Sequence, residues 1–239
     1  MGKPDIIYED NDIIVCYKPA GIATQTRRIG QQDMESFIRN YRAAKNEPPY
    51  VGIVHRLDQP VEGVMVFAKN QKAAASLSRQ IKEHTTEKYY RAASRGHGVS
   101  GADKEEDNKE DNHDPAWHTL TDYISFDKRT NTSKITSEKD RLAKKAVLQY
   151  RILSNECNKT EFDIKLLTGR HHQIRLQLAN IGYPLIGDTK YGKPASNNSG
   201  TGNVAGRTGS CVREQLALCS YKLVFEHPAT GERMTFELP

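Results

Sequence analysis

Short segments rich in apolar, β-branched and aromatic residues recur along the chain between polar turns, and this pattern is typical of β-strands. Two pairs of such segments flank short polar turns and predict hairpins, one joining 6–9 to 13–18 and the other joining 216–226 to 234–238. Further strands are predicted at 51–54, 63–69, 88–94, 119–125, 145–153 and 161–167. Their spacing favours a mixed, largely antiparallel sheet.

Two segments have the apolar spacing of an amphipathic helix instead. The first follows Asn70, a residue type that often caps a helix N-terminus. Its shared apolar face consists of Ala73, Ala74, Leu77 and Ile81. The second begins at about His171 and is closed by Gly182, and its inward residues are Ile174, Leu178 and Ile181. Helices that flank a strand-rich sheet predict the α+β class.

The length of 239 residues and the 36% share of hydrophobic residues are sufficient for one domain with a sizeable core. Composition changes at 40–49, and two segments lack apolar periodicity: the acidic tract 101–114 and the Gly-, Ser- and Asn-rich stretch 193–210. Such segments bury too little apolar area to offset chain entropy, so we expect flexible surface loops. We therefore expect a single domain over residues 1–239 with two loop insertions.

No segment resembles a membrane span or a secretion signal. The longest apolar runs, such as 64–68, have five residues, against the roughly 20 that a spanning helix needs. The four cysteines lack the spacing of a zinc knuckle or of a disulfide framework, and we expect them to be reduced and structural. These features predict a cytoplasmic protein without membrane contact and without a metal site.

Positive charge predominates once the acidic tract is set aside. The chain has 35 Lys and Arg against 30 Asp and Glu, and the tract 101–114 alone holds seven acids and two bases. The remaining residues carry a net charge of +10. An excess of this size favours a basic face and a nucleic-acid partner, although lysines retained only for solubility would give the same total.

Polar residues interrupt an apolar strand at the tetrapeptide 55–58 (HRLD), and the strand resumes after Gly63. Loops held by rigid strands often carry catalytic residues. Pro60 and Gly63 predict a tight reversal that presents Asp58 outward. A turn in which Asp58 merely pairs with Arg56 explains the same residues.

A second polar segment follows the strand that ends at Leu167. A turn at 168–169 leads into the predicted helix, which places Arg175 on the same side as His171. The adjacent His171 and His172 do not share a helix face, and this favours surface or capping histidines over a metal site.

Two tyrosines lie in the predicted strand 88–94. Side chains alternate across a strand, so Tyr89 and Tyr90 must point to opposite faces and one of them can face a site. A core tyrosine with a hydrogen-bonded hydroxyl is the alternative.

Taken together, these segments resemble the RluA class of RNA pseudouridine synthases. The resemblance spans nearly the whole chain, and the combination of HRLD with a later TGRxHQIR is more specific than either motif alone. The residues that carry it are 17–21 (YKPAG), 55–58 (HRLD), Gly63, 68–69 (AK), Lys88, Tyr90, Ala92, Gly96, 144–146 (KKA), 168–170 (TGR), 172–175 (HQIR), Gly182, Pro184, 187–188 (GD), 191–192 (YG) and 227–228 (HP).

By this resemblance Asp58 corresponds to the catalytic aspartate, Tyr90 to the active-site tyrosine and Arg175 to the basic residue that pairs with the aspartate. Arg56 matches the arginine associated with displacement of the target base. The same motifs assign further RNA-binding roles to His55, Arg170, His172 and Gln173.

The resemblance also implies the fold, the substrate class and the partners. It predicts a catalytic domain without an N-terminal S4 domain, a monomer that isomerises uridines in rRNA or tRNA, with no cofactor and no metal. Two departures concern the RNA target: Val61-Glu62 stands where Thr-Ser is usual, and His171 replaces the usual Thr or Ser.

The residue types suit this reaction, which breaks the N1–C1′ bond, turns the uracil and rejoins it through C5. Asp58 can attack C1′ or take the C2′ proton, and Arg175 favours the ionised carboxylate that either step needs. Tyr90 can stack on the uracil and relay the C5 proton. Two alternatives stay open: an RNA-binding or ribosome-assembly protein whose chemistry has lapsed, and an N-glycosidic hydrolase that uses Glu62 as a second carboxylate.

Overall fold

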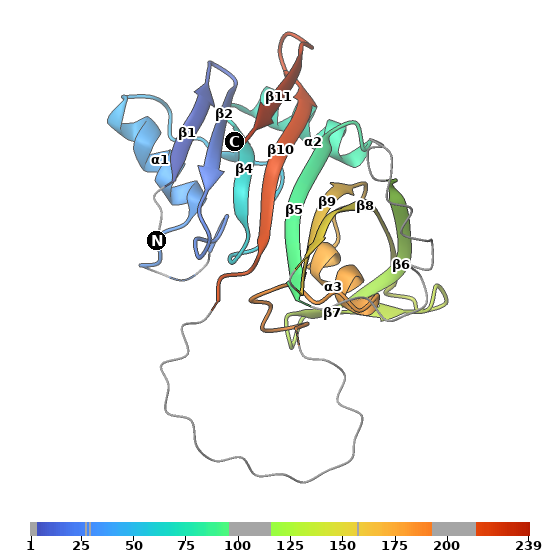
Figure 1. The fold of residues 1–239 in the computed structure, drawn as a ribbon. Coiled ribbons are helices and arrows are strands. Elements are labelled where there is room, and N and C mark those ends of the chain that lie inside the picture. The colour runs from blue at the N-terminus through green and yellow to red at the C-terminus, as the bar shows by residue number, and fades with distance from the viewer. Residues whose placement is uncertain (1–3, 27, 29, 96–115, 157, 193–213) are drawn as a thin grey trace, which may run out of the picture.

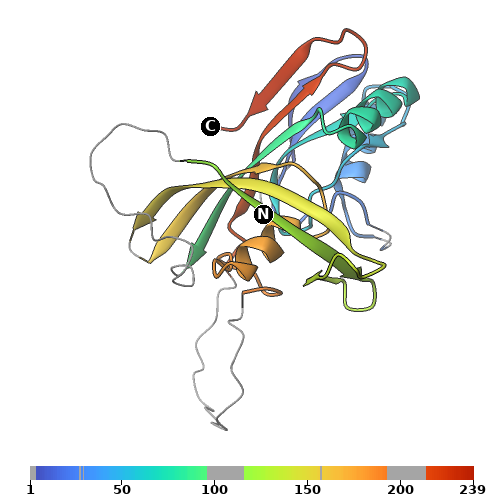
Figure 2. The same ribbon diagram turned by 90° about the vertical axis from the view of Figure 1, so that its right-hand side faces the viewer.

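The computed structural model describes residues 4–26, 28, 30–95, 116–156, 158–192 and 214–239. The loops predicted at 101–114 and 193–210 lie outside these residues. Within them, eleven strands form one sheet and three helices pack against its faces (Figures 1 and 2). None of these helices is long and apolar enough to span a membrane. Cys16 and Cys219 are free thiols, and Cys157 and Cys211 lie outside the described residues.

The sheet is mixed, as the sequence predicts. Its strands are β1 (Asp5–Glu9), β2 (Ile13–Lys18), β3 (Gly52–Ile53), β4 (Glu62–Ala68), β5 (Glu87–Arg95), β6 (His118–Asp127), β7 (Thr132–Thr136), β8 (Lys144–Glu156), β9 (Lys159–Leu166), β10 (Leu218–Glu226) and β11 (Arg233–Glu237). The helices are α1 (Met34–Ala44), α2 (Gln71–Lys82) and α3 (Gln173–Asn180). The strand order is β1-β2-β4-β10-β5-β9-β8-β6-β7, with β11 beside β10 and β3 beside β4. Among the described pairs only β4 with β10 is parallel, which confirms the largely antiparallel α+β fold.

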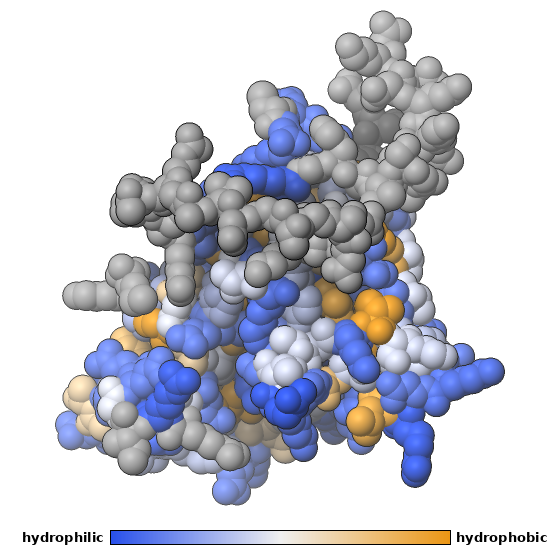
Figure 3. Space-filling view, turned by 90° about the horizontal axis from the view of Figure 1, so that it is seen from below, coloured by the Kyte–Doolittle hydropathy of each residue, from blue (hydrophilic) through white to orange (hydrophobic). Residues whose placement is uncertain are grey.

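Strands β2 and β4 are buried on both faces. Ile14 and Phe67 belong to a core cluster that α1 and α3 cover, whereas Ile13 and Val66 belong to a second cluster that α2 and β11 cover. Burial on both faces explains why these strands have continuous apolar runs. Seen from below, the outer surface is mainly hydrophilic, and its hydrophobic residues lie in small separate groups (Figure 3).

The other half of the sheet, β5-β9-β8-β6-β7, curves around α3 (Figures 1 and 2). Helix α3 lies in the hollow and contacts β6 and β7. Its buried Leu178 joins the same core cluster as residues of β2 and β4. The loop before α3 thereby faces loop 55–58 across a cleft that both segments line.

The two predicted helices are present, with one change at a boundary. The Asn70 side chain accepts a hydrogen bond from the Ala73 N–H at 2.9 Å, and Ala73 and Leu77 are buried as expected. Helix α3 is shorter than predicted because His172 has a left-handed backbone (φ 54°), so the helix begins at Gln173. A residue in this conformation cannot continue an α-helix.

Helix α1 and strand β7 are not among the predicted elements. Helix α1 begins with a capping box in which the Asp33 side chain accepts from the Ser36 N–H and the Ser36 hydroxyl oxygen accepts from the Asp33 N–H. Along its 11 residues Met34, Ile38 and Arg42 are buried, and Phe37 and Tyr41 are partly buried against the core. Strand β7 has the largely polar sequence TSKIT.

Glycine is required at position 63, where β4 meets β10. Ser220 pairs with Gly63 in this parallel contact. Gly63 has a φ of 133°, and a Cβ there would lie 2.2 Å from the Ser220 carbonyl oxygen. A side chain at this position is therefore disfavoured by the backbone conformation and by the lack of space.

We expect Gly63→Ala to lower the free energy of unfolding by more than about 3 kcal/mol, because backbone atoms of β10 must move to admit the methyl group. The matched control is Gly231→Ala, since Gly231 also has a positive φ (75°) but no atom lies within 4 Å of the added Cβ. Left-handed strain alone predicts a loss of about 1 kcal/mol there. Urea unfolding measures both values, and equal losses would contradict the steric explanation.

Candidate active site

One cleft, with a volume of about 1180 Å³, brings the predicted motifs together. It is lined by loop 55–58, by β5 and by the segment that leads into α3. Every predicted site residue lies along it, namely His55, Arg56, Asp58, Tyr90, Arg170, His172, Gln173 and Arg175. Segments that are more than a hundred residues apart in sequence therefore share one site, as the resemblance predicts.

Loop 55–58 is fixed by residues that sequence analysis left without a role. The Thr24 hydroxyl donates to the Leu57 carbonyl at 2.9 Å and accepts from the Leu57 N–H at 3.1 Å. Lys18 is fully buried and donates to three carbonyl oxygens, including that of Gln59 at 3.2 Å. Burial lowers the pKa of Lys18 to about 8, although the nearby Asp58 charge opposes this shift. These contacts hold the backbone on both sides of Asp58.

His55 supports the strand beside the loop. Its ring Nε2 accepts a hydrogen bond from the Val66 N–H at 3.0 Å. Burial lowers the pKa of His55 to about 3, and the nearby Lys88 charge lowers it further. A neutral ring that accepts a backbone hydrogen bond positions loop 55–58 and carries no charge to a phosphate.

Arg175 faces two carboxylates. Its Nη1 lies 3.7 Å from Asp58 Oδ2, which is an ion-pair contact but is longer than a hydrogen bond. Its Nε and Nη2 each donate to Asp188 at 2.7 Å, and both of these side chains are almost inaccessible to solvent. The predicted pairing of Arg175 with Asp58 is thus present, but the stronger partner is Asp188. Asp188 is among the residues that carry the resemblance, but no role was predicted for it.

Asp188 also organises the turn that follows it. Its Oδ1 accepts from the N–H groups of Lys190 at 2.8 Å and Tyr191 at 3.1 Å. Burial alone would raise the pKa of Asp188, but the hydrogen bonds and charge of Arg175, with these N–H groups, hold it below the usual value. Asp188 therefore remains an anion and keeps Arg175 in place.

His172 approaches Asp58 from the other side, with Nε2 3.6 Å from Asp58 Oδ2. Its Nδ1 lies 2.9 Å from the Tyr191 hydroxyl, which already accepts from the Ser133 N–H. Burial lowers the pKa of His172 to about 3, and the Arg175 charge lowers it further, so the ring is neutral. We assign the Tyr191 proton to Nδ1, and this leaves Nε2–H directed toward Asp58.

Gln173 is buried and has a structural role, whereas Arg56 and Arg170 present positive charge to the cleft. Gln173 is buried, and its Oε1 accepts from the Thr168 hydroxyl at 2.8 Å and the Arg170 N–H at 3.0 Å, so it shapes the turn before α3. Arg170 is half-buried and donates to the Lys145 carbonyl at 2.9 Å. Arg56 is exposed and has no ion pair among the described residues. Both cations can reach a phosphate group.

Tyr90 supplies an aromatic ring to the cleft. It is 5% exposed, whereas Tyr89 lies on the opposite face of β5 and packs against Tyr221. This confirms the predicted alternation. Burial raises the pKa of Tyr90, the Asp58 charge raises it further, and a hydrogen bond with Ser220 opposes the shift. The hydroxyl is therefore neutral at pH 7.

A cluster of metal-ligand residue types, Asp10, Asp12 and His227, lies elsewhere in the described residues. His227 Nε2 contacts Asp10 Oδ2 at 2.8 Å, and Asp12 accepts from the Asn70 side chain at 2.7 Å. Asp10 Oδ1 accepts from the N–H groups of Asp12 and Ile13, both at 2.8 Å. None of these three residues lines the cleft. We infer that the cluster joins the β1–β2 hairpin to the β10–β11 hairpin.

Comparison with known proteins decides the family. The family model for RNA pseudouridylate synthase matches residues 12–180. This chain belongs to that family. The matched segment includes Asp58, Tyr90 and Arg175, whereas Asp188 lies beyond it.

Curated members of the family align with nearly the whole chain. The ribosomal large subunit pseudouridine synthase D of Neisseria meningitidis is 31% identical over 98% of this chain and 58% of its own length. The protein of the same name from Vibrio cholerae is 32% identical over 98% of this chain and 67% of its own length. The chain thus spans about six tenths to two thirds of these relatives. An uncharacterized RNA pseudouridine synthase of Bacillus subtilis, YhcT, is 31% identical over 100% of this chain and 69% of its own length.

A solved structure confirms the pseudouridine synthase fold. Human RNA pseudouridylate synthase domain containing 4 superposes with a TM-score of 0.71 over 98% of this chain and 88% of that chain, at 20% sequence identity. The likeness at this identity concerns the arrangement of helices and strands alone.

The neutral histidines make stability depend on pH. His55 and His172 each have a pKa near 3 in the folded protein, against an ordinary value of 6.5. The unfolded chain therefore binds protons first, so the free energy of unfolding is fully present above about pH 6.5 and decreases below it, by up to about 1.4 kcal/mol per pH unit for each histidine.

We expect His172→Asn to reduce this pH dependence by up to about 1.4 kcal/mol per pH unit, because one of the two histidines no longer titrates. Asparagine is chosen because it also tolerates the left-handed backbone at this position. Urea unfolding between pH 7.5 and 5 measures the slope. An unchanged slope would mean that His172 is protonated in the folded protein as readily as in the unfolded chain.

Proposed function

We propose that this chain converts uridine to pseudouridine in RNA, with Asp58 as the catalytic carboxylate, Tyr90 as its aromatic partner and Arg175 as the cation that faces Asp58. One observation carries the proposal. The Asp58 side chain is 32% exposed in the same cleft as the buried Tyr90 ring, and it lies 3.7 Å from a buried guanidinium. An accessible anion beside a fixed cation and an aromatic ring suits attack on a base-sugar bond.

The residues divide the reaction among them. The target nucleotide leaves its stack and enters the cleft, at a cost of a few kcal/mol, and Arg56 at the rim can occupy the vacated space. Asp58 attacks C1′ or removes the C2′ proton, and both steps use an anion that the Arg175 charge stabilises. Tyr90 is neutral, so its ring can stack on the uracil and its hydroxyl oxygen can take part in moving the C5 proton.

A hydrolase is the alternative function, but among the described residues Asp58 is the only carboxylate that lines the cleft. Glu62 accepts hydrogen bonds from the Tyr17 hydroxyl at 2.8 Å and from Gln215 Nε2 at 3.0 Å, and it lines a separate groove. A hydrolase needs such a group beside the bond to activate water. A lapsed RNA-binding protein would have no need to keep Asp58, Tyr90 and Arg175 around one cleft.

We further propose that the RNA is rRNA or tRNA and that residues 1–239 form one catalytic unit. Two relatives are named for the large ribosomal subunit, and one continuous sheet joins both halves of the described chain. Arg56 and Arg170 supply cations for phosphate contacts at the rim. The monomeric state and the cytoplasmic location stay predictions.

We expect Asp58→Asn to abolish pseudouridine formation while RNA affinity changes less than about threefold, because phosphate contacts supply most of the affinity. Glu62→Gln is the matched control and should retain turnover. Carbodiimide mapping of modified RNA measures the product, and a filter assay measures binding. Release of free uracil by the wild-type protein would instead support a hydrolase, and turnover by the Asp58→Asn variant would remove Asp58 from its assigned role.

We expect Arg175→Lys to lower kcat by at least about tenfold with little change in KM, because one ammonium cannot make two hydrogen bonds to Asp188 and face Asp58 at once. Arg170→Lys, an identical substitution along the same cleft, should retain kcat within about threefold, since Arg170 does not contact Asp58 and a lysine there keeps the positive charge for phosphate. Equal losses in the two variants would show that Arg175 acts only as a general positive charge.

A further inference from the structure

Three aromatic rings lie in a row between the cleft rim and Asp58. Phe126, at the end of β6, has its ring centre 4.2 Å from that of His171, and His171 stacks on His172 with centres 3.7 Å apart. Phe126 and His171 line the cleft, and Phe126 is 39% exposed there. An aromatic face thus remains open to solvent in the cleft that also holds the proposed catalytic carboxylate.

Hydrogen bonds hold the middle ring in one orientation. The Ser133 hydroxyl donates its proton to the His171 carbonyl at 2.8 Å. It must therefore accept from His171 Nδ1, which lies 3.0 Å away, and this fixes the ring by its Nδ1–H. Phe126 rests against this fixed ring, so the open aromatic face is held in place before any ligand binds.

Positive charges lie near His171, the middle ring of the row. Burial lowers the pKa of His171, and the cations of Lys190, Arg175 and Arg56 lower it further against the opposing Asp58 charge. The ring is therefore neutral at pH 7, and three cations lie close enough to act on it. Aromatic faces among positive charges are typical of surfaces that bind single-stranded nucleic acid, since bases stack on the rings while phosphates meet the cations.

We propose that Phe126, supported by His171, is a stacking platform for an unpaired nucleobase next to the uridine in the cleft. This inference rests on the proposed function, because it takes RNA as the molecule that enters the cleft. Stacking accepts any base, so the platform contributes affinity and orientation more than sequence selectivity. In the resemblance described above, position 171 usually carries Thr or Ser, so the ring behind Phe126 is a feature of this chain.

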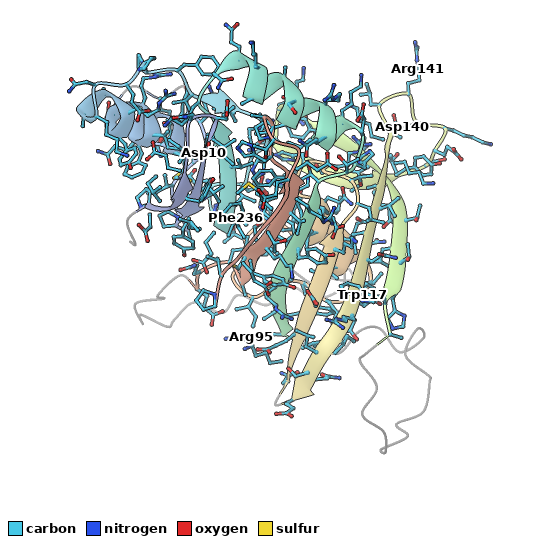
Figure 4. All side chains as sticks on the ribbon, turned by 90° about the horizontal axis from the view of Figure 1, so that it is seen from above. Asp10, Arg95, Trp117, Asp140, Arg141 and Phe236 are labelled. Atoms are coloured by element: carbon cyan, nitrogen blue, oxygen red, sulfur yellow. The ribbon has the colours of Figure 1, made fainter. Side chains whose placement is uncertain are left out.

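The test compares three variants at two equally exposed aromatic residues. Phe126→Leu keeps an apolar side chain but removes the ring, and Phe126→Tyr keeps the ring. Trp117→Leu is the control, because Trp117 is also 39% exposed and lies just before the other end of β6. Trp117 does not line the cleft. The loop that contains Asp140 leads into β8, whose first residues pair with β6 near Phe126. Figure 4 shows Trp117 far from Asp140 and therefore far from that end of β6.

The probe is a short single-stranded oligouridylate that carries one 2-aminopurine, whose fluorescence decreases when it stacks. We expect the wild-type protein, Phe126→Tyr and Trp117→Leu to quench the probe and bind it alike. Phe126→Leu should lose the quenching and bind about 5- to 100-fold more weakly. Thermal unfolding of each variant checks that the fold is retained.

Either of two results would overturn the platform: full quenching and affinity in Phe126→Leu, or an equal loss in Trp117→Leu. Neither readout requires turnover. If the wild-type protein forms no pseudouridine in the carbodiimide assay, the proposed function fails while the binding comparison still decides whether Phe126 stacks on a base.

Discussion

The pair of hydrogen bonds between Arg175 and Asp188 sets the geometry of the whole site. Both side chains are nearly inaccessible, and a buried charge that loses its partner is far more costly than an exposed one. Arg175 is therefore held by a carboxylate thirteen residues later in the chain, not by Asp58. Asp58 faces a cation whose position is already fixed, so it can change charge or form a bond without loosening the protein around it.

The same separation of roles recurs on the other side of Asp58. Lys18 and Thr24 hold the loop backbone through carbonyl and N–H groups, and neither contacts the Asp58 carboxylate in a hydrogen bond. His172 is held by Tyr191, which is itself held by Ser133. Lys18, Thr24, Ser133 and His172 are thus buried and hydrogen-bonded, whereas Asp58, Arg56 and Phe126 keep accessible surface. Preorganisation of this kind lowers the cost of reaching a reactive geometry.

Sequence patterns predicted the elements whose burial is regular. The apolar runs in 13–18 and 63–69 and the Asn70 cap correspond to β2, β4 and α2. Helix α1 was missed although Met34, Phe37, Ile38 and Tyr41 have helical spacing and Asp33 and Ser36 mark its start, so the sequence did contain this signal. The resemblance brought Asp58, Tyr90 and Arg175 together, but the preference of Arg175 for Asp188 depends on three-dimensional distance, which no spacing in the chain encodes.

Strand β10 lies between β4, which follows loop 55–58 in the chain, and β5, which carries Tyr90. Its residues 218–226 come late in the chain, yet they complete the middle of the sheet. During synthesis on the ribosome, β4 and β5 each keep one unpaired edge until this strand emerges. The sheet between loop 55–58 and Tyr90 is therefore completed only after residues 218–226 have emerged, and a nascent chain that already carries Asp58 and Tyr90 still lacks the strand that joins them.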